Sequence, residues 1–130
     1  MTDADFESES YRAYENGLNL TREKMQWYWS VYLAGADPLH PDASPMRASD
    51  LRGVAPALVQ TSEYDPLCSE GERYGQRLAE AGVAGTVTRY DGTIHGFLRM
   101  PAFTPAANRA LDEIAAALSI AGTTAAPPTR

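Results

Sequence analysis

The chain has 130 residues, of which 44% are hydrophobic and 22% are charged, with a formal net charge of −6. This length suffices for one domain with a core, and the negative charge argues against binding to nucleic acid or to anionic membranes. The acidic amino terminus lacks the apolar core of a secretory signal, and a single cysteine, Cys68, fits a reducing compartment. We therefore expect a cytoplasmic protein.

The first 56 residues predict one helix between two irregular segments. Residues 1–20 are polar and are expected to form a loop that drapes over another part of the protein. Thr21 is a candidate N-cap for a helix that ends near Gly35. Its apolar residues at helical spacing are Met25, Trp29, Tyr32 and Leu33. Four prolines in residues 35–56 predict an ordered connector without sheet or helix.

Two strands separated by a helix are expected next. Residues 57–62 suit a buried parallel strand, and residues 86–90 are β-branched and aromatic. Between them, Ser69 and Glu72 have the spacing of a capping box, and Gly82 suits the end of a helix. Its expected apolar face consists of Tyr74, Leu78 and Ala81. After the second strand, Asp91-Gly92 predicts a turn.

The last predicted element is an amphipathic helix. Thr104 and Pro105 suit its N-cap and first position, and the helix is expected to end near Ser119. Its expected apolar face consists of Ala107, Leu111, Ile114 and Leu118. The small residues and prolines of residues 121–130 predict a disordered tail, so one domain over residues 1–120 is expected.

The order strand, helix, strand predicts a parallel pair, and two parallel strands need neighbours to form a stable sheet. The chain is therefore expected to be the carboxyl-terminal part of a larger α/β fold with an incomplete sheet. Asp65 follows the first strand and His95 follows the second. Because open α/β sheets keep their chemistry at the carboxyl ends of strands, these two residues are the candidate site.

Several segments together resemble one family. They are Thr21-Arg-Glu-Lys-Met-Gln-Trp-Tyr-Trp, Ala43-Ser-Pro-Met-Arg, Glu63-Tyr-Asp-Pro-Leu, Glu70-Gly and Arg89-Tyr-Asp-Gly-Thr-Ile-His-Gly-Phe. In this order they resemble the carboxyl-terminal half of hormone-sensitive-lipase-type carboxylesterases, which have the α/β-hydrolase fold. The resemblance covers roughly residues 11–119.

The resemblance implies hydrolysis of carboxylic esters by a serine, aspartate and histidine triad, with no metal or organic cofactor. Asp65 and His95 match the acid and the histidine of that triad. In such a triad the histidine is general base and then general acid, and the acid fixes its tautomer. Phe97, next to this motif, is a candidate for the substrate pocket.

The nucleophile of this family is not found in the chain. No His-Gly-Gly-Gly segment and no Gly-x-Ser-x-Gly elbow occurs in the sequence. Ser69 has glycine on one side only and suits a helix cap. Cys68 is an alternative nucleophile, but a nucleophile needs a strained elbow with oxyanion donors nearby. Asp37-Pro38-Leu39 repeats the acid motif in the connector, where it and His40 are expected to be structural.

Two interpretations follow from this pattern. In the first, the chain is part of an ester hydrolase that is completed by a complementary amino-terminal half, whether on the same polypeptide or on a separate one. In the second, it is a truncated product without catalytic activity. Under either interpretation, the chain by itself is expected to be inactive toward esters.

Overall fold

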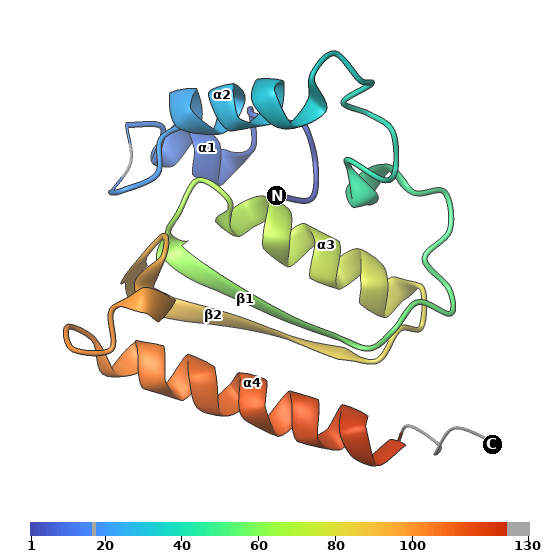
Figure 1. Ribbon diagram of the computed structural model, residues 1–130, viewed down its shortest axis with the longest axis vertical. Coiled ribbons are helices and arrows are strands. Elements are labelled where there is room, and N and C mark those ends of the chain that lie inside the picture. The colour runs from blue at the N-terminus through green and yellow to red at the C-terminus, as the bar shows by residue number, and fades with distance from the viewer. Residues whose placement is uncertain (17, 125–130) are drawn as a thin grey trace. The chain divides into compact units, whose positions relative to one another are not determined.

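The computed structural model describes residues 1–16 and 18–124 (Figure 1). The chain divides into two compact units, residues 1–95 and the residues from Gly96 onward. The first unit contains a sheet of two parallel strands with the order β1-β2. Helix α3 packs against this sheet, and helices α1 and α2 belong to the same unit. The predicted α/β fold with a short parallel sheet is confirmed. No helix in the described part of the chain has the length and hydropathy to cross a membrane.

The amino-terminal segment is more ordered than the sequence predicts. Residues 9–13 form the short helix α1 (Glu9–Ala13), so the expectation of a loop over residues 1–20 is wrong at this point. Tyr11 of this helix is completely buried and forms a core cluster with Leu20 and Met25. The aromatic ring supplies the apolar area that fixes this otherwise polar segment.

Helix α2 (Arg22–Leu33) begins where the sequence predicts it. The Thr21 Oγ1 accepts the Lys24 N–H at 3.1 Å, which confirms the N-cap. Met25 is buried, but Tyr32, which was expected on the same apolar face, is 69% exposed. The partly covered side of the helix continues from Met25 through Trp29 and Leu33, at steps of four residues, and leaves Tyr32 outside it.

The connector is tied to helix α3. It contains the 3₁₀ helix η1 (Pro45–Arg47), which the sequence does not predict, and otherwise no regular element, in agreement with the prediction. The Arg77 guanidinium donates hydrogen bonds to the carbonyls of Met46 and Ala48. Leu51 joins Leu78 and Val83 in a second core cluster. These contacts make the connector part of the first unit.

Strand β1 (Ala57–Tyr64) and helix α3 (Cys68–Glu80) contain the expected residues with different limits. The helix begins before Ser69, so the predicted capping box is wrong. Its first turn is instead set by Asp65, whose carboxylate accepts the Leu67 N–H and whose carbonyl accepts the Cys68 N–H. Gly82 has φ +77°, which confirms the predicted left-handed glycine after the helix.

Strand β2 (Gly85–Ile94) runs through the predicted turn. Asp91-Gly92 forms an irregularity inside the strand, because Gly92 has φ +73° and its N–H donates to Glu63 Oε2 at 2.6 Å. The offset between paired residues is 90 − 62 = 28 at Ser62 and Tyr90, and 94 − 64 = 30 at Tyr64 and Ile94. Strand β2 therefore carries two extra residues near its end, in the manner of a β-bulge.

Helix α3 packs closely against the sheet at Gly75. A Cβ on Gly75 would overlap the Val87 side chain of β2 and touch Val59 of β1. Although alanine favours helix by about 1 kcal/mol, we expect Gly75→Ala to destabilise the protein by about 1–3 kcal/mol, because the overlap must be relieved by moving the helix. Urea unfolding measures this change. The double variant with Val87→Ala should recover most of the loss, and an equal loss in both would contradict the packing explanation.

The second unit contains η2 (Phe97–Arg99) and α4 (Pro105–Thr124). Thr104 Oγ1 accepts the Ala106 N–H at 3.2 Å, in agreement with the predicted N-cap. Helix α4 continues past Ser119 to Thr124, so the expected helix end is too early and residues 121–124 are helical rather than part of a tail. The remaining predicted tail, residues 125–130, lies outside the described residues. Of the predicted apolar face, Ala107 is buried, whereas Leu111 and Leu118 are exposed.

Candidate active site

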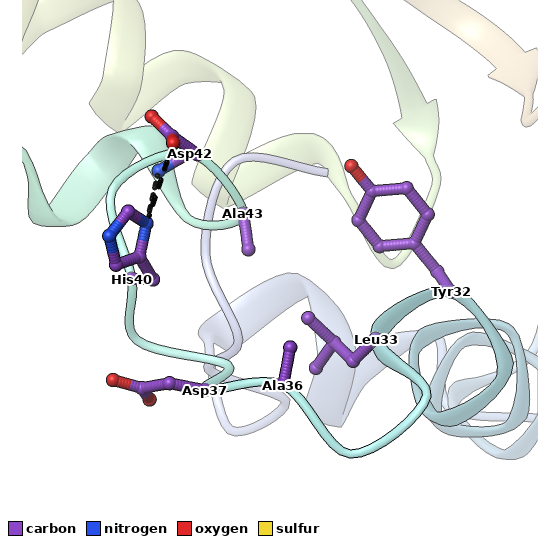
Figure 2. A pocket seen from close by; sticks show the side chains of 7 residues that line it. All are labelled: Tyr32, Leu33, Ala36, Asp37, His40, Asp42 and Ala43. Carbon is purple, nitrogen blue, oxygen red and sulfur yellow. Dashed lines mark hydrogen bonds and ion pairs between the residues drawn. The ribbon is translucent and has the colours of Figure 1, made fainter.

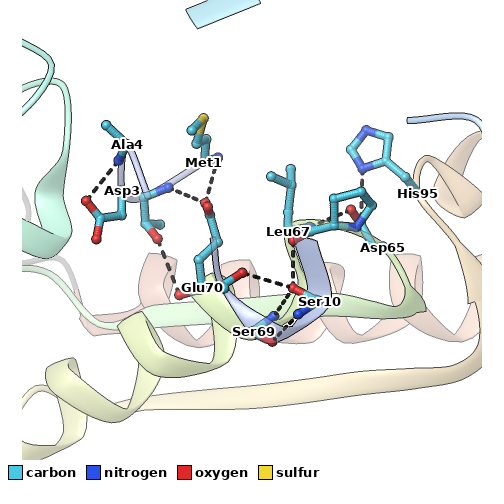
Figure 3. A network of polar contacts seen from close by, with 12 residues as sticks. Met1, Asp3, Ala4, Ser10, Asp65, Leu67, Ser69, Glu70 and His95 are labelled. Atoms are coloured by element: carbon cyan, nitrogen blue, oxygen red, sulfur yellow. Dashed lines mark hydrogen bonds and ion pairs between the residues drawn. The ribbon is translucent and has the colours of Figure 1, made fainter. Parts of the chain in front are cut away.

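Asp65 and His95 meet at the carboxyl ends of the two strands. Tyr64 and Ile94 are register partners in the parallel pair, and the candidate residues follow them directly. Asp65 Oδ2 lies 2.8 Å from His95 Nδ1, which is a hydrogen-bond distance (Figure 3). The structure thus brings the two candidate residues together in the contact by which the acid of a triad orients its histidine.

The irregularity in β2 decides which residue faces Asp65. With the offset of 28 that holds up to Ser62, the residue beside Asp65 would be Thr93 (65 + 28). The two extra residues change the offset to 30 and place His95 there instead. Thr93 Oγ1 donates to the Tyr90 carbonyl at 2.6 Å and helps to close the irregular segment. Asp91-Gly92 thus aligns the histidine with the acid.

The two oxygens of Asp65 have different partners. Oδ1 accepts the Leu67 N–H at 2.9 Å, which fixes the carboxylate plane, and Oδ2 is left for the histidine. The Asp65 side chain is 10% exposed and that of His95 is 35% exposed. A buried acid with a half-buried histidine is a suitable arrangement for a proton-transfer pair, because the acid is shielded while the outer ring nitrogen can reach a reactant.

The connector holds a second acid and histidine with different geometry (Figure 2). Asp37 and His40 line a hollow of about 340 Å³ that is also lined by Tyr32 and Leu33. His40 Nδ1 lies 3.7 Å from an Asp42 carboxylate oxygen and 3.3 Å from the Asp42 N–H nitrogen, which donates to it. Nδ1 therefore acts as an acceptor here, whereas a triad needs an Nδ1–H donor. Asp37 makes its bond to the Leu39 N–H, so the prediction that this motif is structural agrees with its contacts.

Neither candidate for an internal nucleophile has the required setting. The Ser69 Oγ accepts the Ser10 N–H at 3.1 Å, and this bond replaces the capping role that the sequence predicts. Burial, followed by the nearby Glu72 carboxylate, raises the pKa of the Cys68 thiol to about 11. At neutral pH only about one thiol in ten thousand would be ionised, and the thiolate is the reactive form. Phe97 is buried in η2, and its role in a substrate pocket stays a prediction.

Sequence reasoning missed three side chains around this site. Glu70 is buried near the start of α3, Ser10 contacts the loop after Asp65, and Asn19 donates to the His95 carbonyl. The residues around Glu70 are polar, so the sequence did not indicate that this glutamate is buried. Glu70-Gly71 is nevertheless one of the segments that resemble the family. Ser10 and Asn19 carry no local signal, because their partners lie more than fifty residues away.

Glu70 holds the amino-terminal segment on α3. Its Oε1 accepts the Thr2 N–H at 2.6 Å, and its buried Oε2 has no hydrogen-bond partner (Figure 3). Burial raises the pKa of Glu70 to about 7, against the opposing effect of the Thr2 N–H. A carboxyl group that binds its proton more tightly in the folded state favours folding at low pH.

This pKa predicts a pH dependence of stability. Between the ordinary value of 4.5 and about 7, the folded chain keeps a proton on Glu70 that the unfolded chain has released. The free energy of unfolding should therefore fall by about 3 kcal/mol as the pH rises through this window. Glu70→Gln should remove this part of the slope in urea unfolding at pH 4.5 and 7.5. The exposed Glu80→Gln is the control, and a slope that survives Glu70→Gln would contradict the assignment.

Parallel strands with a helix between them and an acid–histidine pair at their carboxyl ends are the features of part of an α/β hydrolase. A family model described as alpha/beta hydrolase fold matches residues 1–99. The chain belongs to this family, the hormone-sensitive-lipase-type carboxylesterases, as its motifs indicate.

Comparisons with individual relatives support this family assignment. The chain is 39% identical over 102 residues to the carboxylic ester hydrolase LipN of Mycobacterium tuberculosis, covering 76% of this chain and 27% of that protein. It is 34% identical over 119 residues to an ethyl acetate hydrolase of Pseudomonas putida, covering 91% and 37%. The chain thus spans about a third of the length of these relatives.

Two crystal structures of related enzymes contain a portion whose backbone is similar to that of this chain. One is an alpha/beta hydrolase enzyme from the metagenome of Lake Arreo, with a TM-score of 0.85 at 40% identity, covering 95% of this chain and 39% of that one. The other is a thermostable esterase from Pseudomonas putida, with a TM-score of 0.81 at 42% identity, covering 87% and 37%. Identities of 40% and 42% show that these proteins are similar to this chain in sequence as well as in fold.

Proposed function

We propose that this chain supplies the acid and the histidine of a carboxylic ester hydrolase. Asp65 and His95 are the two triad members, and a serine nucleophile with its oxyanion donors comes from polypeptide outside these 130 residues. The observation that carries the proposal is the 2.8 Å contact between Asp65 Oδ2 and His95 Nδ1 at adjacent strand ends. Membership in a carboxylesterase family supports the same reaction.

In the proposed reaction His95 transfers one proton in each half. Its Nε2 accepts the serine hydroxyl proton while the serine oxygen attacks the ester carbonyl, and it then gives that proton to the departing alcohol. A water molecule repeats the sequence on the acyl-enzyme, so that the carboxylic acid leaves and the serine regains its proton. Asp65 keeps Nδ1 protonated and stabilises the imidazolium that forms in each half.

The two-stranded sheet supports the need for a complementary portion. Sheets of this kind need three or more strands, or packing on both faces, for independent stability. Val87 on β2 is 43% exposed, and Trp27, Val31 and Tyr32 on α2 are each more than half exposed. An amino-terminal portion of the hydrolase, on the same polypeptide or on a separate one, would add strands to the sheet and cover apolar surface. The substrates are small carboxylic esters.

The test is a chimaeric enzyme. The 130-residue chain would replace the aligned portion of the ethyl acetate hydrolase of Pseudomonas putida. We expect the remaining residues of that protein to supply the nucleophile. We expect hydrolysis of short-chain esters and labelling by a serine-reactive phosphonate, with His95→Ala abolishing turnover. His40→Ala is the matched control and should retain it. A folded chimaera that is inactive, or that loses activity equally with both histidine changes, would overturn the proposal in favour of a non-catalytic product.

A further inference from the structure

Ser10 of α1 bonds directly to the loop that carries Asp65. This serine is 5% exposed, and its Oγ donates to the Pro66 carbonyl at 2.6 Å. The same Oγ accepts the Ser69 N–H at 3.0 Å, and the Ser10 N–H donates to Ser69 Oγ at 3.1 Å (Figure 3). The two serines are thus joined reciprocally, and the peptide next to the acid is held from outside its own turn.

These bonds limit the movement of the carboxylate. Pro66 is fully buried, and the Leu67 N–H that follows it is the partner of Asp65 Oδ1. With the Pro66 carbonyl and the Ser69 amide both fixed by Ser10, the turn of residues 65–69 cannot rotate freely. The Oδ2 atom therefore stays directed at His95, 2.8 Å away.

Asn19 makes the corresponding contact on the histidine side. Its side-chain Nδ2 donates to the His95 carbonyl at 3.0 Å, and its own carbonyl accepts from Lys24 Nζ at 3.2 Å. Its φ is +89°, a conformation that favours glycine and costs a non-glycine residue about 1 kcal/mol or more. Glycine at this position would avoid the strain but would lose the bond to His95.

We propose that Ser10 and Asn19 are positioning residues that hold Asp65 and His95 in register from one amino-terminal segment. Ser10 acts on the acid through Pro66 and Ser69, and Asn19 acts on the histidine through its backbone carbonyl. The effect on turnover rests on the proposed function, whereas the effect on the Asp65–His95 bond does not. Reacting groups displaced by about 1 Å can lose about a hundredfold in rate, so loosening this segment has a measurable cost.

The chain offers a matched control for Ser10. Ser44 is also fully buried, and its Oγ donates to the carbonyl of Pro38 at 2.6 Å, in the second Asp-Pro-Leu segment. Ser10→Ala and Ser44→Ala each remove a serine bond to a proline carbonyl, one beside Asp65 and one beside Asp37. Ser10→Ala removes in addition the bond from the Ser69 N–H. The readout is nitrogen NMR of the His95 imidazole in the folded chimaera, which reports the tautomer and the hydrogen-bonded Nδ1–H.

We expect Ser10→Ala to speed exchange of the His95 Nδ1–H with water by about tenfold, the effect of losing roughly one hydrogen bond. The proportion of the Nε2–H tautomer should rise with it. Ser44→Ala should leave both quantities unchanged. Equal changes in the two variants, or none in Ser10→Ala, would overturn the assignment of Ser10.

Asn19→Gly distinguishes an effect on the position of His95 from an effect on the stability of the fold. Because glycine relieves the strained φ, the unfolding midpoint should stay the same or rise, while the His95 Nδ1–H exchanges faster. Ser30→Ala, which removes an exposed bond to the Trp27 carbonyl, is the control and should not affect His95. An unchanged His95 signal in Asn19→Gly would overturn the assignment of Asn19.

The chimaera provides the functional readout. Ser10→Ala and Asn19→Gly should each lower kcat by about tenfold or more with KM within twofold, as expected for displaced reacting groups. Ser10→Thr, which keeps the hydroxyl, should restore most of the kcat lost in Ser10→Ala. If the chimaera with unchanged residues is inactive, the proposed function fails while the NMR result still decides the positioning role. If kcat is unaffected in an active chimaera, the positioning role fails alone.

Discussion

Asp65→Asn is expected to lower kcat of the chimaeric enzyme by up to about ten thousandfold, because an amide presents the wrong hydrogen-bond partner to the histidine. The aspartate accepts the Nδ1–H at Oδ2 and leaves Nε2 free to take the serine proton. An asparagine that offers its N–H to Nδ1 would shift the ring proton to Nε2. The base would then be absent from the side that faces the serine.

Asp37→Asn is the matched control. It lies in the same tripeptide, Asp-Pro-Leu, and its Oδ1 makes the same bond to a leucine N–H, at 2.9 Å in both cases. Asp37 is exposed, and the imidazole nearest in sequence, His40, accepts rather than donates at Nδ1. Turnover of Asp37→Asn should stay within about twofold of the unchanged chimaera, since exposed substitutions have small effects. Comparable losses from both substitutions would mean that the acid is assigned to the wrong motif.

The second large effect is expected for the 130-residue chain by itself. Purified without a partner, it should neither hydrolyse a short-chain chromogenic ester above the buffer rate nor react stoichiometrically with a phosphonate probe. The acid and the histidine are present, but a triad without its nucleophile loses about six orders of magnitude in turnover. Addition of a serine-containing amino-terminal portion is expected to restore hydrolysis and labelling of that portion.

Cys68 and Ser69 are the two residues that could act as an internal nucleophile and so contradict this prediction. Cys68 is buried with a raised pKa, and Ser69 is engaged with Ser10. Neither Cys68→Ser nor Ser69→Ala should change the background rate of the isolated chain. Steady turnover that depends on one of these residues and on His95 would show an internal nucleophile. The chain would then be an enzyme without a partner.

The local sequence predicted the order of helices and strands better than it predicted the role of individual residues. Strand, helix, strand and helix follow in the predicted order because apolar periodicity, Thr21, Gly82 and Pro105 act over a few residues. The errors lie where distant contacts compete with local preference. Ser69 was predicted to cap a helix, but its Oγ bonds to Ser10, fifty-nine residues away. Asp91-Gly92 has the composition of a turn, but Glu63 on the neighbouring strand holds it as an irregular part of β2.

The two Asp-Pro-Leu segments show what the sequence by itself decided. In both, the aspartate Oδ1 accepts the leucine N–H, and a buried serine donates to the proline carbonyl at 2.6 Å. The aspartate–leucine bond is the same in both turns because the same three residues form it locally. The serine bond is local only at Pro38, because Ser44 is six residues away in sequence whereas Ser10 is fifty-six residues from Pro66. Without the surrounding motifs of the family, nothing within either tripeptide distinguishes the candidate acid.

The wider sequence favours Asp65, which follows a predicted strand and lies in the family motifs, but only the tertiary structure shows which aspartate meets a histidine. The parallel register and the two extra residues of β2 bring His95 beside Asp65, and the segment with Ser10 and Asn19 fixes both loops. The connector gives Asp37 no such neighbour, and it remains exposed. The physical reason is that a hydrogen bond between residues thirty positions apart depends on strand pairing, which sequence periodicity predicts only as a topology and not as a register.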